Sequence, residues 1–89
     1  MSEERFFLYD ENNSVDSRFV SFVGEYNRFD LAIITTDRYF GKKIVLDIQG
    51  NRFAIIGQDD VEEPGYLEHA YNLSEVEADE LRDFLREVI

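Results

Sequence analysis

The stretch NLSEVEADELRDFLREVI (residues 72–89) decides the fold, because it predicts an amphipathic helix with one apolar side. Ser74 is a preferred N-cap residue, and Glu77 three positions later completes a capping box. At about 100° per residue, the apolar side chains fall within an arc of roughly 140°. They are Ala78, Leu81, Phe84, Leu85, Val88 and Ile89. A helix of this kind buries one side only, so we expect it to pack across one face of a sheet.

The residues before this helix predict the sheet. Short apolar or β-branched runs, separated by turn residues, occupy 5–9, 18–23, 28–36, 42–49 and 52–57. The connections are too short for parallel crossovers, so neighbouring strands should be antiparallel. Gly50-Asn51 predicts a two-residue hairpin of type II′. We therefore predict an α+β fold in a single domain over residues 1–89: an antiparallel sheet of about five strands with one C-terminal helix packed on one face.

Alternate residues of a strand point to opposite faces, so each predicted strand has two sides. We assign the more apolar side to the core beneath the helix. That set is Phe29, Leu31, Ile33, Ile44, Leu46, Ile48, Phe53 and Ile55. The other side is mixed, with an apolar centre made of Ala32, Ile34, Val45, Ala54 and Ile56. Because an exposed apolar patch of this kind usually marks a contact surface, we predict these five residues as a candidate interface.

That second face has three possible covers. The first is the N-terminal strand, if it curls round to make a half-barrel. The second is the segment 58–72, and the third is a second subunit. Because a domain of 89 residues has a small core, association with another chain would add useful burial. We expect a homodimer or a complex with another protein, and the leading functional hypothesis is a non-enzymatic protein-interaction module.

The net charge of −11 is concentrated in the second half of the chain. Residues 1–52 hold nine acidic and seven basic side chains, whereas residues 53–89 hold eleven and two, a net charge of −9. Such a surface repels nucleic acid and anionic membranes, so we expect neither as a partner. It supports an alternative function, that of an acidic adaptor or decoy that binds a basic protein.

The chain contains no cysteine, which excludes disulfides and thiolate zinc sites. Its first residues are acidic where a signal peptide needs basic ones, and no stretch approaches the roughly 20 apolar residues of a membrane helix. These features favour a cytoplasmic location.

The acidic stretch QDDVEEPGYLEH (residues 58–69) contains the only histidine and the only proline. We interpret it as a solvated connector, with His69 in a structural role, either packed against Tyr66 or Tyr71 or hydrogen-bonded to a backbone carbonyl. A second alternative is a small metal-binding or hydrolytic enzyme that uses His69 and the neighbouring carboxylates. The spacing does not match a calcium loop, since Tyr71 occupies the position of the bidentate glutamate. We predict no catalytic residue, metal, cofactor or small-molecule ligand.

Three stretches carry a resemblance to a known family: RFVSFV (18–23), DLAIITTDRYFGKKIVLDIQGNRFAIIGQDD (30–60) and GYLEHAYNLSEVEADELRDFLREVI (65–89). Together they resemble a domain-of-unknown-function family of small cytosolic proteins from Gram-positive, Bacillus-type bacteria. The likeness spans about residues 5–89. It implies a compact α+β domain in the cytosol, and it implies no reaction and no assigned site residues.

Overall fold

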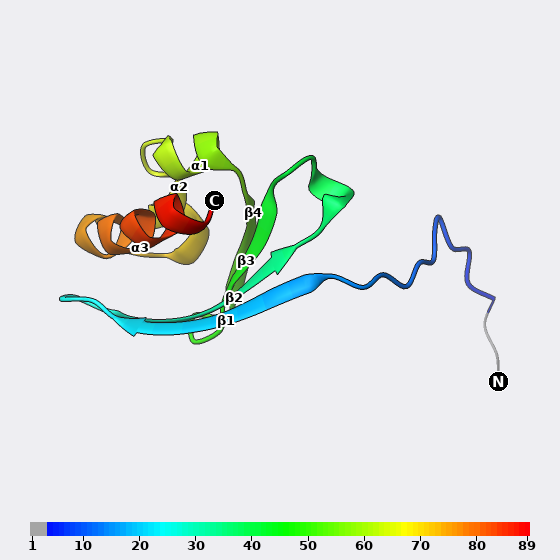
Figure 1. The fold of residues 1–89 in the computed structure, drawn as a ribbon, viewed down its shortest axis with the longest axis horizontal. Helices are drawn as coiled ribbons and strands as arrows, with labels where there is room; N and C mark the ends of the chain where they lie inside the picture. Colours follow the sequence, from blue (N-terminus) through cyan, green and yellow to red (C-terminus); the bar gives the residue numbers. More distant parts are fainter. Residues whose placement is uncertain (1–3) are drawn as a thin grey trace.

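The computed structural model describes residues 4–89 and shows an antiparallel sheet followed by three helices (Figure 1). The four strands are neighbours in chain order. They are β1 (Asp16–Val23), β2 (Arg28–Thr35), β3 (Lys43–Asp47) and β4 (Arg52–Ile56), with a short 3-10 helix η1 (Asp37–Tyr39) between β2 and β3. The helices are α1 (Gln58–Glu62), α2 (Tyr66–Tyr71) and α3 (Glu75–Val88). The predicted α+β class is therefore confirmed; the first three residues of the predicted domain lie outside the described part.

Helix α3 begins and packs as its sequence predicts. The Ser74 hydroxyl accepts a hydrogen bond from the Glu77 amide (3.3 Å), and the Glu77 carboxylate accepts one from the Ser74 amide (2.9 Å). The apolar side of the helix faces the sheet. Its members Ala78, Leu81 and Leu85 are buried, and Phe84, Val88 and Ile89 pack against the core.

The segment 58–72 contains the stretch 58–69 that was predicted to be a solvated connector, and it differs from that prediction. It forms α1 and α2, which join α3 on the same side of the sheet (Figure 1). Val61, Leu67 and Tyr71 are buried in the core, and the Tyr71 hydroxyl donates a hydrogen bond to the Val45 carbonyl (2.8 Å). The prediction was wrong because helices of five or six residues are too short to show a periodic pattern. Asp59 and Glu62 are exposed on the outer side of α1.

The N-terminal strand predicted over residues 5–9 is absent. Residues 4–15 form no helix or strand, and they run away from the domain with a bend at Leu8 (Figure 1). The sheet consequently has four strands, and β1 is one of its two edges.

The connection between β3 and β4 is also longer than predicted. It turns through residues 48–51, and Asn51 rather than Gly50 has a positive φ, of 59°. The Asp47 carboxylate accepts a hydrogen bond from the Gly50 amide (3.1 Å). This side-chain bond fixes a four-residue turn in place of the predicted type II′ hairpin, as short acidic side chains commonly do.

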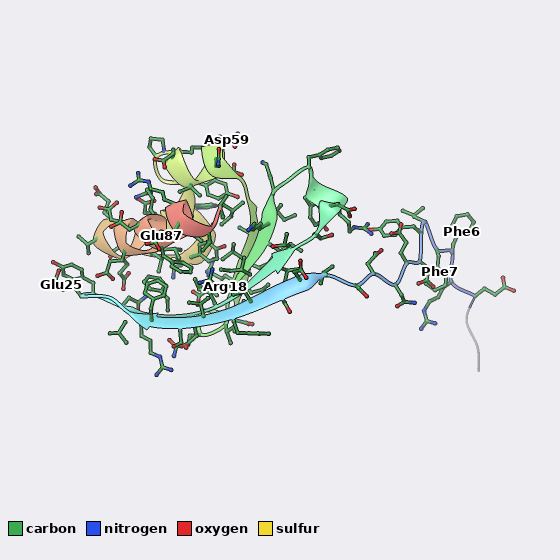
Figure 2. All side chains as sticks on the ribbon, in the orientation of Figure 1. Phe6, Phe7, Arg18, Glu25, Asp59 and Glu87 are labelled. Atoms are coloured by element: carbon green, nitrogen blue, oxygen red, sulfur yellow. The ribbon has the colours of Figure 1, made fainter. Side chains whose placement is uncertain are left out.

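The turn between β1 and β2 is fastened to α3 by a carboxylate. Glu80 accepts hydrogen bonds from the amides of Glu25 and Tyr26, the second at 3.0 Å. Gly24 lies directly against this carboxylate, and any larger side chain there would overlap it. The end of the hairpin is thus held on the helical side of the sheet, where Figure 2 shows Glu25.

Candidate functional site

The pairing register decides which strand residues lie beneath the helices. Ile33 of β2 is opposite Val45 of β3, which is in turn opposite Ala54 of β4. Residues directly opposite each other in an antiparallel pair point to the same face. Val45 and Ile56 are 0% exposed and belong to the core under the helices, and Ala54 packs against it. We call this side of the sheet the covered face.

The structure therefore divides the five residues of the predicted interface. Ala32 and Ile34 lie on the opposite, uncovered side, as expected. The placement of Val45, Ala54 and Ile56 beside them was wrong, since all three contact the helical layer.

The converse assignment was wrong too. The loop of residues 36–42 sets which residues of β3 align with those of β2, and it includes two positive φ angles, at Phe40 and Gly41. A shift of one residue in such a loop exchanges the two sides of every following strand. The side chains that were assigned to the core but lie on the uncovered side are Ile44, Leu46, Phe53 and Ile55. Ile48, also assigned to the core, lies in the turn after β3 and is 53% exposed.

We call the uncovered side of the sheet the open face. Two rows of directly opposed side chains cross its centre. One row is Phe19, Ala32, Leu46 and Phe53, and the other is Ser17, Ile34, Ile44 and Ile55. Phe19 is 75% exposed and Phe53 is 66% exposed. Neither row contains a charged side chain, so the open face is a continuous apolar surface.

Charges on the open face lie at its border. Arg28 and Asp30 form an ion pair there, with 3.2 Å between the guanidinium and the carboxylate. Asp30 also accepts a hydrogen bond from the Ser21 hydroxyl (2.6 Å). These three side chains are hydrogen-bond and ion-pair partners of one another. The border therefore presents paired polar groups beside the apolar centre.

The charged residues of β3 lie on the covered face and have structural partners. The Lys43 ammonium donates a hydrogen bond to the Val88 carbonyl (2.8 Å), at the C-terminal end of α3, where a positive charge is favoured. Asp47, at the other end of the strand, holds the following turn. A strand with the pattern Lys-Ile-Val-Leu-Asp therefore turns its charged side toward the helices and its larger apolar side outward.

His69 lies exposed on α2, so the expected packing beside Tyr66 or Tyr71 was wrong. The neighbouring acids serve ion pairs: the Glu68 carboxylate lies 3.5 Å from the Arg82 guanidinium, and the Asp60 carboxylate lies 3.0 Å from the Lys42 ammonium. Within residues 4–89, no three His, Cys, Asp or Glu side chains gather as metal ligands would.

The Asp60 carboxylate also helps to start α1. It accepts a hydrogen bond from the Gly57 amide (2.8 Å), and this bond, together with the Lys42 ammonium, lowers the pKa of Asp60 below its ordinary value. Asp60 thus joins the loop before β3 to the first helix, which is a structural role.

A hollow of about 280 Å³ lies between α1 and α3, where an ion pair crosses its rim. The Arg86 guanidinium and the Glu62 carboxylate are 2.7 Å apart, and their hydrogen bond lowers the pKa of Glu62. Pockets for small ligands usually enclose about 300–1,000 Å³. This hollow is slightly smaller than that range, and the Arg86 and Glu62 side chains at its rim pair with each other, so it offers few free polar groups to a ligand.

Comparison with known proteins assigns the chain to a family, and that family has no known activity. No helix among residues 4–89 is long and apolar enough to cross a membrane. No curated protein matches the chain. The SAV0927-like family matches residues 8–87, which include the whole sheet and nearly all of α3. This match confirms the resemblance at the level of an uncharacterised family, whereas the Bacillus-type source and the cytosolic location stay predictions. The chain belongs to the SAV0927-like family, an uncharacterised family named after a Staphylococcus aureus protein.

Proposed function

We propose that the protein is a protein-interaction module that forms a homodimer through the open face. One observation carries the proposal: the hairpin of β3 and β4 turns its larger apolar side away from the helices. Ile44, Leu46, Phe53 and Ile55 lie on that outward side. Among the described residues, nothing packs over it (Figure 1). A sheet face of this composition is normally buried against another layer.

Burial supplies the free energy for association. A fully buried Phe or Leu side chain contributes about 1.5–3 kcal/mol relative to an exposed one. Phe19 and Phe53 are both more than half exposed. A two-fold symmetric dimer would bury both residues in each of its two subunits. The open face therefore offers several large contributions within one self-complementary surface.

The charge distribution supports the same surface. The helical side of the molecule carries the acidic residues of the second half of the chain, among them Asp59 and Glu87 (Figure 2). A dimer formed through the helices would bring two such layers together and would be opposed by charge repulsion. The open face contains only the Arg28–Asp30 pair at its border, so two copies can meet there without this cost.

The acidic helical layer supports a second proposal, an adaptor that binds a basic protein. Such binding is electrostatic and weakens as salt screens the charges. Dimerisation through the open face is apolar, and added salt should leave it unchanged or strengthen it. The two proposals use opposite sides of the molecule, so one protein could serve both.

Light scattering after size-exclusion chromatography tests the homodimer. We expect the full chain to have twice its monomer mass of 10.5 kDa over a concentration series, at both low and high salt. Phe53→Asp should reduce the mass to that of the monomer while the circular dichroism spectrum stays unchanged. The control Val76→Asp changes an exposed aliphatic residue on α3 and should leave the dimer intact.

Two outcomes would overturn the proposal. One is a monomeric wild-type chain at every concentration. The other is a dimer that persists in Phe53→Asp but dissociates at high salt, which would point to contacts between charged surfaces.

A further inference from the structure

We call the N-terminal segment, residues 4–15, the arm. It carries a second apolar surface that is not covered. Its run Phe6–Tyr9 has four large apolar side chains in succession, and their exposure alternates along the chain. Phe6 and Leu8 are 93% and 90% exposed, whereas Phe7 and Tyr9 are 61% and 65% exposed. Phe6 and Leu8 are therefore the two side chains of the run with the least contact to their own chain.

The other side of the arm is attached to its own chain. The Arg38 guanidinium, in η1, lies 5.0 Å from the centre of the Tyr9 ring and 2.8 Å from the Glu11 carboxylate. Attraction to Glu11 raises the pKa of Arg38 above its ordinary value. A cation over an aromatic face and an exposed ion pair two residues apart place one side of the arm beside the end of β2. Phe6 and Leu8 remain available.

The attachment also sets the direction of the arm. Figure 2 shows Phe6 and Phe7 well outside the domain, beyond the end of the sheet. To reach its own open face, the arm would have to reverse its direction after Glu11 and release Tyr9 from Arg38. Each copy of the chain thus has an apolar segment that its own domain does not use and an apolar face that its own domain does not cover.

We infer that the arm of one copy docks on the open face of a second copy, with Phe6 and Leu8 as its contacting side chains. The inference rests on the proposed homodimer and identifies what covers the face. In a two-fold symmetric dimer the exchange is reciprocal, so each arm lies on the other subunit. The centre of the receiving surface is the row that contains Phe19, Ala32 and Leu46.

The size of the arm fits a specific interface. A buried aromatic side chain such as that of Phe6 removes roughly 150–250 Å² from water. Two exchanged arms, together with the surface they cover, would remove on the order of 1,200 Å² or more from water, which is the range of stable protein interfaces. The acidic helical layers stay on the outside in this arrangement.

Serine substitutions in the arm test its role. We expect the double variant Phe6→Ser and Leu8→Ser in the full chain to weaken the dimer at least tenfold, measured as the dissociation constant by sedimentation or light scattering. The control Val76→Ser, on α3, should leave the constant unchanged. If the double variant dimerises like the wild type, the arm inference fails while the proposed homodimer stands. A monomeric wild type would overturn both.

Cysteine cross-linking distinguishes exchange between copies from folding back. The natural chain has no cysteine, so introduced thiols have no competitors. A mixture of the Leu8→Cys and Phe53→Cys variants, carrying tags of different mass, should give a disulfide-linked heterodimer on mild oxidation. Leu8→Cys mixed with Val76→Cys is the control and should give little product. A single chain that carries both Leu8→Cys and Phe53→Cys tests folding back. An intramolecular disulfide in that chain, without the heterodimer in the mixture, would overturn the inference.

Discussion

The two faces of the sheet differ in a way that composition alone does not suggest. The covered face of β3 has Val45 between Lys43 and Asp47, whereas the open face has Ile44 and Leu46. The less apolar side is the one under the helices. It can be buried because Lys43 and Asp47 sit at the two ends of the strand and reach hydrogen-bond partners at the rim of the core. Polarity along a strand therefore does not identify its covered side when the polar groups have partners.

The largest expected effect comes from placing a charge on each face in turn. Val45→Asp puts an unpaired carboxylate in the core and should destabilise the domain by about 4 kcal/mol or more, enough to unfold it. Leu46→Asp, one residue further, should leave the fold intact and prevent self-association. Circular dichroism and thermal unfolding of the two variants provide the comparison. Equal loss of folding in both would contradict the distinction between the faces.

Shortening an apolar side chain of α2 tests how much this helix contributes to the stability of the domain. Leu67 is fully buried, so Leu67→Ala should lower the free energy of unfolding by about 2–5 kcal/mol. Ile44→Ala, on the open face, should cost clearly less when the protein is diluted to a monomer, because a partly exposed residue leaves no closed cavity. Urea titration measures both changes. A cost below about 1 kcal/mol for Leu67→Ala would restore the connector interpretation of residues 58–69.

The hydroxyl of Tyr71 links α2 to the backbone of β3 on the covered face. Loss of its hydrogen bond in Tyr71→Phe should cost about 1 kcal/mol at neutral pH. Burial raises the pKa of Tyr71 above its ordinary value of 10.0.

This shift gives the variant a distinct dependence on pH. The folded state keeps the Tyr71 proton where the unfolded chain loses it, so this contribution to stability is complete below pH 10.0 and falls as the pH rises further. Tyr71→Phe should therefore unfold less steeply with alkali than the wild type. The control Tyr26→Phe, which alters an exposed ring, should follow the wild-type curve. Identical curves for all three proteins would show that the Tyr71 hydroxyl is not buried.

The smallest effect on folding is expected at the centre of the open face. Phe19→Ser should change the free energy of unfolding of the monomer by no more than about 0.5 kcal/mol, because the ring is already largely exposed. The same substitution should strongly weaken the dimer. Unfolding measured at low and high protein concentration separates the two effects. A large loss of stability at low concentration would mean that the ring packs within its own subunit.

The sequence by itself determined α3, its capping box and its buried side, because these depend on residues three and four positions apart. It also determined the antiparallel order of the strands, since the connections are short. The tertiary structure alone decided which side of β3 and β4 the helices cover. Both sides of these strands are apolar, and the loop of residues 36–42 shifts the register by an amount that no strand pattern records. The tertiary structure also decided that residues 58–72 close the core. Val61, Leu67 and Tyr71 become neighbours only after two short helices have formed over the sheet.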